Sequence, residues 1–251
     1  MKKLLLVPAV FALQCCNAQA DAIGIYISGQ VWDNQASGKF GEMDQQLDFN
    51  LADEKQGSYS IAFEHPLPFI PNAKIANTSL ATQGITSING EFSFDDKLFV
   101  DSPLSANFDV SYTDYTLYYE IFDNGLFSFD IGLTGRDFDG DVSVTGEAID
   151  DLTITGSIAT DDMVPMLYAS TSLGLPLTGV NLFAQGNFLS VDEHSLYDYQ
   201  AGVSYEVIDN LVVDFNLTLG YRATKFTLED INDLYTDLEF KGLFAGAVVH
   251  F

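Results

Sequence analysis

The chain has 251 residues, of which 36 are acidic and 10 are Lys or Arg, so its formal net charge is −26. It is nevertheless apolar on average, with 47% hydrophobic residues, 13% aromatic residues and a mean hydropathy of +0.11. Because disordered acidic tails lack aromatic residues, this composition excludes one. The shortage of cations excludes nucleic acid as a partner, because phosphate binding needs clustered Lys and Arg.

The N-terminal segment 1–20 has the features of a secretory signal peptide. Lys2 and Lys3 precede an apolar run over 4–13, and Ala18-Gln19-Ala20 is a small-x-small cleavage signature. The apolar run is too short for a transmembrane anchor, which needs about 20 residues. We expect cleavage after Ala20.

Both cysteines, Cys15 and Cys16, lie inside this segment. Neither follows the small residue that a lipoprotein signal requires, so we expect no lipid anchor. The mature chain, 21–251, then has no disulfide, no Cys nucleophile and no Cys-ligated metal. Its net charge becomes −28 once Lys2 and Lys3 are removed.

Alternation with a period of two dominates the rest of the chain. Every second residue is apolar and the intervening residues are polar or small, as in membrane strands that face lipid on one side and a lumen on the other. A soluble β-sandwich also alternates, but these strands have the length of about ten residues that a tilted membrane strand needs, and aromatic residues stand at their ends. The pattern is clearest in 23–32, 113–122, 127–136, 197–207 and 211–222.

The connections between these strands fall into two classes, short ones rich in turn residues and long acidic ones. In outer-membrane barrels the short turns are periplasmic and the long loops are extracellular. The turns are 65–72, 123–125, 176–179 and 208–210, and the loops are 33–57, 95–105, 138–162, 192–195 and 227–237. They predict one domain, an all-β transmembrane antiparallel up-and-down barrel of about ten strands in the outer membrane. Eight strands is the alternative, because the third span alternates poorly. Within 142–158 we expect a hairpin above the membrane. The expected strands are 22–32, 58–65, 74–94, 106–122, 126–137, 163–175, 180–191, 196–207, 211–226 and 238–251.

The C-terminus resembles the assembly signal of outer-membrane barrels. Gly246, Val249 and the terminal Phe251 stand where that signal has them, whereas Phe244 stands where a polar residue is usual. The resemblance implies the outer-membrane assembly machinery as a partner.

Two arginines, Arg136 and Arg222, fall on lumen-facing positions near the outer strand ends. The inward faces also carry Asp114, Asp198 and four further acidic residues, and we expect those four to be the ion-pair partners of the arginines. A barrel of this width is nearly filled by its own side chains, so we expect a structural ion-pair network and a plugged lumen. The named partners are Glu120, Asp130, Glu206 and Asp214.

The acidic loops offer a candidate metal site. Asp137, Asp139 and Asp141 resemble the start of a calcium loop, because hard cations bind clustered oxygens. The pattern then breaks, with Val142 and Ala148 at later ligand positions. Opportunistic Ca²⁺ or Mg²⁺ binding and a solvated acidic loop are the alternatives, and we expect no other cofactor. Divalent ions could also bridge these loops to lipopolysaccharide, which with outer-membrane lipid is an expected partner.

Catalysis has one weak candidate. Asp137 and Asp139, with Asp192 and His194, resemble the paired catalytic residues of omptin proteases, in which a His–Asp pair activates water. In so acidic a chain, such spacings of Asp and His arise by chance. A lipid-modifying enzyme would need a Ser–His pair, but Ser195 and His194 are neighbours on a strand and therefore point in opposite directions. We expect no enzyme.

The run 24–29 with Trp32 and Gly38, the turn 63–68 with Pro71-Asn72, and the Phe251 terminus resemble a proteobacterial outer-membrane protein family with a GlyGly association. Size and topology are more loosely similar to small barrels of the OmpW and OmpA type. The resemblance implies an outer-membrane barrel and no assigned activity. We therefore expect a non-enzymatic barrel with an envelope or surface-contact role. A narrow channel or carrier is the alternative.

Overall fold

The computed structural model describes residues 23–42, 45–149, 152–160, 162–191, 194–210, 212–231 and 234–251. The predicted signal peptide, 1–20, lies outside them. Among the described residues no helix is long and apolar enough to cross a membrane.

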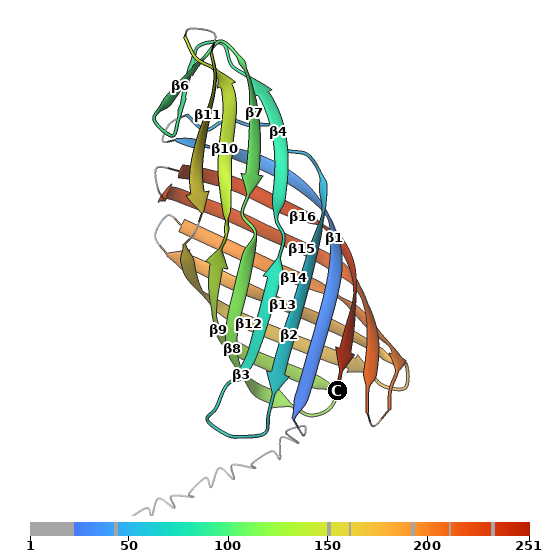
Figure 1. The fold of residues 1–251 in the computed structure, drawn as a ribbon. Coiled ribbons are helices and arrows are strands. Elements are labelled where there is room, and N and C mark those ends of the chain that lie inside the picture. Colours follow the sequence, from blue (N-terminus) through green and yellow to red (C-terminus); the bar gives the residue numbers. More distant parts are fainter. Residues whose placement is uncertain are drawn as a thin grey trace, which may run out of the picture.

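Ten antiparallel strands form a closed barrel, as predicted, and they are strongly tilted (Figure 1). Strand β1 pairs with β16 over 17 residue pairs and with β2 on its other edge, so the first and last strands close the wall. The order around the wall is β1 (Gly24–Glu42), β16 (Leu234–His250), β15 (Asp214–Ile231), β14 (His194–Ile208), β13 (Val180–Val191), β12 (Met163–Leu175), β9 (Phe127–Phe138), β8 (Tyr112–Asp123), β3 (Asn72–Thr78) and β2 (Glu54–Glu64).

The alternation sets which way each side chain points. In β1, Ile25, Ile27 and Val31 are exposed on the outer wall, whereas Trp32, which follows Val31, is only 1% exposed inside. The same division holds along β9, where Leu133 is exposed and Thr134 and Arg136 are buried. In a closed barrel every strand edge is hydrogen-bonded to a neighbouring strand, and the outer surface of this barrel is apolar. The chain therefore spans the outer membrane.

Two ends of the barrel differ. The four short connections and the C-terminus lie at one end, and the long connections rise at the other (Figure 1). Short turns are periplasmic in such barrels and long loops are extracellular. The predicted turns at 65–72, 123–125, 176–179 and 208–210 all fall between barrel strands at the periplasmic end.

The third predicted strand, 74–94, is wrong in its extent. The barrel uses only β3, and after Ser79 the chain leaves the wall and forms β4 (Ala81–Ser87). The fourth, 106–122, is similarly divided between β7 (Pro103–Asp109) and β8, and 33–42 is strand rather than loop. The poor alternation of the third span coincides with the break between β3 and β4, whereas β7 has a buried face of its own, so periodicity alone could not separate β7 from β8.

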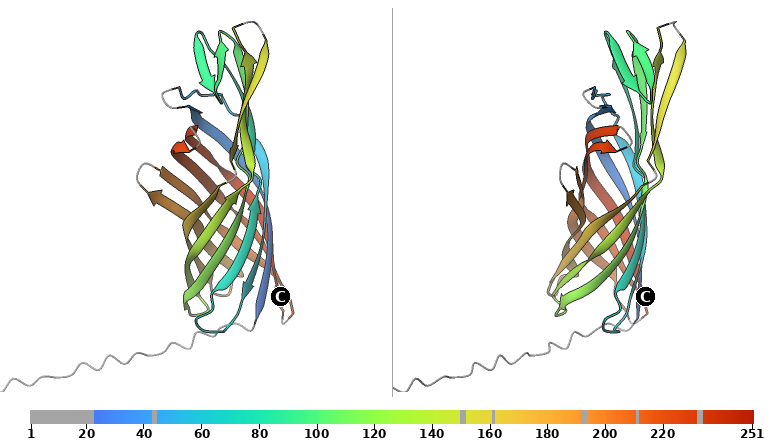
Figure 2. Two further views of the ribbon diagram at one scale, coloured as in Figure 1. Left: turned by 60° about the vertical axis from the view of Figure 1, so that its left-hand side comes forward. Right: turned by 90° about the vertical axis from the view of Figure 1, so that its left-hand side faces the viewer.

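These extra strands build an extracellular sheet that stands above one side of the barrel (Figure 2). The predicted hairpin within 142–158 is present as β10 (Gly140–Glu147) paired with β11 (Thr153–Thr160), and its expected tip at 150–151 lies outside the described residues. Strand β7 pairs with β10, and β4 pairs with β7, which gives a four-stranded sheet in the order β11-β10-β7-β4. A small hairpin, β5 (Glu91–Phe94) with β6 (Lys97–Val100), completes the extracellular part.

Barrel and sheet share one hydrophobic core. Phe40 of β1 stacks on Phe49 at 4.6 Å between ring centroids, and it also contacts Phe108 of β7 at 5.2 Å. Phe108 in turn lies 6.2 Å from Phe240 of β16. All four rings are 0–1% exposed, so the sheet is anchored on the barrel through packed aromatic side chains.

Candidate functional site

The outer half of the lumen is spanned by ion pairs around Arg136. This side chain, 0% exposed, binds Asp114 through two parallel bonds, Nε to Oδ1 and Nη2 to Oδ2, each 2.8 Å long. Nη2 also donates to Asp198 Oδ2 at 2.7 Å, and the guanidinium carbon lies 3.5 Å from the centre of the Tyr112 ring. The planar guanidinium can bind in this forked way, whereas Lys could not.

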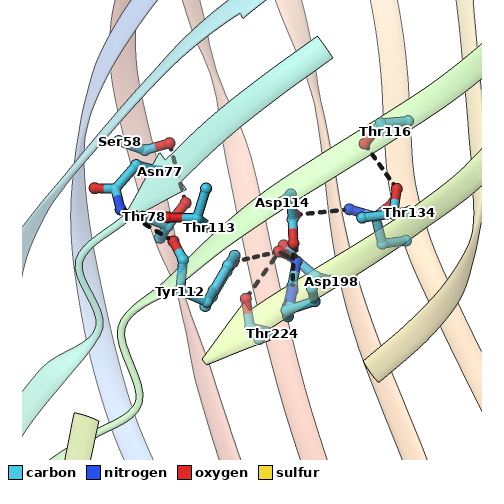
Figure 3. Close-up of polar contacts among 12 residues, drawn as sticks. Ser58, Asn77, Thr78, Tyr112, Thr113, Asp114, Thr116, Thr134, Asp198 and Thr224 are labelled. Atoms are coloured by element: carbon cyan, nitrogen blue, oxygen red, sulfur yellow. Dashed lines mark hydrogen bonds and ion pairs between the residues drawn. The ribbon is translucent and has the colours of Figure 1, made fainter. Parts of the chain in front are cut away.

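Arg222 reaches the same carboxylate from the next strand. Its Nε donates to Asp198 Oδ1 at 3.0 Å and its Nη2 to Oδ2 at 2.9 Å. Tyr112 accepts from Arg222 Nη2 at 2.8 Å and donates to Asp198 Oδ2 at 2.5 Å. Thr224 adds a bond to Asp198 Oδ1 at 3.2 Å. Asp198 is thus held from β8, β9 and β15 at once, and Figure 3 shows it facing Asp114 across the lumen.

Register explains why these residues meet. Asp114 and Arg136 are directly paired on β8 and β9, and Asp198 is paired with Thr224, one inward position beyond Arg222. Directly opposite residues on one sheet face lie about 5 Å apart, and a long guanidinium bridges the remaining distance across the lumen. Two cations and two carboxylates therefore neutralise one another in a buried layer, as buried charges must.

The four acids predicted as network partners do not fill that role. Among the described residues, the ion pairs of both arginines go to Asp114 and Asp198. Asp214 pairs with His250 at 3.2 Å near the C-terminus instead. Glu120, Asp130, Glu206 and Asp214 share the inward face, but they stand several residues closer to the periplasmic turns, beyond the reach of the guanidinium groups. Alternation predicts whether a side chain points into the lumen, but it does not predict the position of that side chain along the barrel axis.

Below the ion-pair layer, the lumen opens into a cavity of about 490 Å³. Two hydrogen bonds cross it, from Lys74 Nζ to Gln185 Oε1 and from Gln30 Nε2 to Gln200 Oε1, both 3.2 Å. The lining is mostly small or neutral and polar, and Lys74 forms no ion pair among the described residues. Sequence analysis did not single out Lys74, although its inward position in an alternating strand was a usable signal.

Comparison with known proteins identifies no relative by sequence: no family model matches the chain, and no curated protein does. Among solved structures it is similar to Neisserial surface protein A, with 13% identity over 90% of this chain and 97% of that one, at a TM-score of 0.30. It is also similar to a Pseudomonas aeruginosa FadL homologue, with 6% identity over 92% and 90% of the two chains and a TM-score of 0.31. The P. putida toluene transporter TodX has 9% identity, coverage of 92% and 89%, and a TM-score of 0.29. This chain is an outer-membrane β-barrel protein.

The structure does not gather the candidate metal ligands. Asp137 ends the outward face of β9, Asp139 lies between β9 and β10, and Asp141 is on β10, so the three follow one another along nearly extended chain. Successive Cα atoms of the three residues are then about 7 Å apart along the chain. Among the described residues, no group of three or more His, Cys, Asp or Glu is placed to hold a metal ion.

The omptin-like residues are also separated. Asp137 pairs with Met163 on the outer wall, whereas His194 has the inward parity of β14 and faces Val191 of β13. Strands β12 and β13 stand between β9 and β14, and Asp192 lies outside the described residues. The structure therefore does not bring Asp137 and His194 together.

The assembly-signal residues lie on the closing strand. Gly246 pairs with Gln30 and Val249 with Ile27 of β1, and Phe251 exchanges two backbone hydrogen bonds with Ile25. Phe244, the departure from the signal, faces the lumen and packs on Gly220, where a Cβ would come within 2.7 Å of its ring. The aromatic ring thus fills the space that the glycine leaves.

Proposed function

We propose that this protein is a non-enzymatic outer-membrane barrel that does not conduct and that acts through its rigid extracellular sheet, in surface contact or envelope integrity. The observation that carries the proposal is the plug. Arg136 and Asp198, at 0% and 5% exposed, close the lumen, and the aromatic core above them continues into the sheet. A lumen filled in this way supports the extracellular sheet and does not conduct solutes.

Planar-bilayer recording tests the closed lumen. The purified barrel should insert without steady single-channel current, because the buried ion pairs leave no continuous water path. Steady conductance in the wild-type protein would overturn the proposal.

Cysteine labelling tests the surface sheet. The mature chain has no other cysteine, so single substitutions give unambiguous labelling. Ser105→Cys on the exposed face of β7 should react in intact cells with a bulky maleimide that cannot cross the membrane. Ser204→Cys, beneath the plug, should not react. Labelling of Ser204→Cys but not Ser105→Cys would place the sheet on the wrong side.

A narrow channel or carrier is the second candidate, and the cavity around Lys74 supports it. A solute could enter from the periplasm and meet an ammonium in a polar cavity whose lining also includes the carboxylates of Glu64 and Asp130. The same recordings test a channel, because a channel needs the plug to move and would show intermittent current.

Two narrower assignments are also proposals. The resemblance of 24–29 with Trp32 and Gly38, of the turn 63–68 with Pro71-Asn72, and of the Phe251 terminus supports membership of the GlyGly-associated family. The pairing of Gly246, Val249 and Phe251 with β1 supports their role as the signal for the assembly machinery.

A further inference from the structure

The lysines of the described residues are unevenly distributed. Lys74 is in the lumen and Lys97 is in the extracellular hairpin, and the other four all face outward on four adjacent strands of the barrel wall. On the opposite wall, the outward residues near the extracellular ends of β8, β9 and β12 are Thr113, Asp137 and Met163. Four of the six lysines thus form one basic sector on β1, β2, β15 and β16: Lys39, Lys55, Lys225 and Lys241.

This sector begins where the lipid-facing band ends. Lys55 pairs with Asp33, and Asp33 pairs with Leu243, a lipid-facing side chain that is 63% exposed. Lys241 is the next outward residue before Leu243 on β16. Lysines at this height extend their ammonium groups along the wall to the lipid headgroups.

Acidic residues in the same sector balance part of this charge. Lys241 pairs with Glu239 at 2.5 Å, and Lys225 pairs with Asp237 at 3.3 Å. Lys55 forms no ion pair among the described residues, although Asp33 is its register partner. Lys39 likewise forms none there. Lys39 and Lys55 are therefore the lysines of this sector without an ion pair in the described part of the chain, and the Lys241 ammonium, which has three donors, can still donate beyond its bond to Glu239.

Directly beneath Lys55, the outer wall is hollowed. A hollow of about 560 Å³ lies over β1, β2, β3 and β16, and Gly, Ala and Ser make up most of its lining, which also includes Tyr59. A Cβ built at Gly29 or at Gly57 meets no atom within 4 Å, so the missing side chains leave open space. Gly29 pairs with Ala247, and Gly57 pairs with Val31, which places these residues in two successive outward rows. The hollow faces hydrocarbon and ends one outward position below the Lys55 ammonium.

We propose that this sector is a binding site for lipopolysaccharide of the outer leaflet, with a phosphate of its lipid A part on Lys55 and Lys241 and an acyl chain in the hollow at Gly29 and Gly57. Two independent features match the two halves of one molecule: cations at headgroup height match a phosphate, and an apolar recess on the same strands matches a chain. The proposal depends on the location in the outer membrane and not on whether the lumen conducts.

Native mass spectrometry of the protein, extracted from outer membranes in mild detergent, tests the site. The wild-type barrel should retain one lipopolysaccharide. Lys55→Gln with Lys241→Gln should lower its occupancy on the order of tenfold, because each surface cation contributes measurably to binding anionic lipid. Gly57→Leu should lower it as well, by filling the hollow without a clash and without removing a charge.

The control variants make the same chemical changes elsewhere. Lys97→Gln removes a cation from the extracellular hairpin, and Gly135→Leu adds a side chain on the far wall, where a Cβ meets only Met163 at an ordinary 3.6 Å. Both should retain lipopolysaccharide, and a heat-dependent shift on gels should show that every variant is folded. Equal retention in all variants overturns the site, as does equal loss in the controls.

Two other occupants would be recognised in the same spectra. Retention of phosphatidylglycerol in place of lipopolysaccharide overturns the assigned lipid. A wild-type dimer without lipid that Gly57→Leu separates into monomers would show that the hollow receives a second copy, which also overturns the proposal.

Discussion

The two halves of the lumen differ although the same alternation builds both. In the outer half, inward side chains are large and complementary, so Arg136, Asp114 and Asp198 bind one another and aromatic rings cover them. In the periplasmic half, inward side chains are mostly small, and single bonds such as that from Lys74 to Gln185 cross a cavity. Side-chain size and charge pairing decide whether a lumen is a plug or a cavity, and the strand count does not.

Removing the central cation is the strongest test of this difference. Arg136→Met leaves Asp114 and Asp198 without their shared partner in a buried layer, and should lower the free energy of unfolding by about 3–5 kcal/mol. Urea unfolding in lipid vesicles measures it. Lys74→Met, the matched change in the cavity half, should cost no more than about 1 kcal/mol, because it removes one hydrogen bond in an open space. Equal losses would mean that the two halves are equally packed.

The junction between barrel and sheet gives the next largest effect. Phe108 is 1% exposed and contacts both Phe40 and Phe240, so Phe108→Ala should cost about 3–4 kcal/mol, mostly in the sheet. The sheet should become sensitive to protease while the barrel keeps its heat-dependent gel mobility. Phe69→Ala, at an exposed periplasmic turn, should change neither property. If the sheet of the Phe108 variant resists protease, it does not depend on the shared core.

The smallest effect comes from an exposed ion pair, which contrasts with the buried one. Lys97 donates to Asp95 at 2.5 Å and the Ser157 amide donates to the same carboxylate, which lowers the pKa of Asp95 below its ordinary 3.8. Because the folded pKa is depressed, the contribution is present above the ordinary pKa and is lost as the pH falls through the lowered value. Protease digestion of the hairpin β5–β6 should therefore be unchanged from pH 7 to pH 5 and faster near pH 3. Asp95→Asn should remove this pH step, and a step that persists would assign it to another group.

Sequence reasoning located the barrel and both arginines, and it placed the four periplasmic turns. It named the wrong carboxylates, because Glu120, Asp130, Glu206 and Asp214 are inward by the same parity as Asp114 and Asp198. Height along a tilted strand depends on the register with its neighbours, and register is a property of the pairing. The candidate metal ligands Asp137, Asp139 and Asp141 failed to converge for a related reason, since the expected loop is mostly strand.

The sequence by itself determined that the protein lies in the outer membrane and which face of each strand meets the lipid. The reason is that hydrocarbon accepts only apolar side chains and that side chains alternate along a strand with a period of two. The chain combines a net charge of −26 with a positive mean hydropathy because its acidic residues lie in the loops and the lumen and its apolar residues face the lipid. Tertiary structure alone decided which charges meet, where the lumen closes, and that β4 and β7 leave the wall to build a sheet on the hairpin β10–β11. These outcomes depend on contacts between residues far apart in the chain, such as Arg136 with Asp198 and Phe40 with Phe108, which no local pattern encodes.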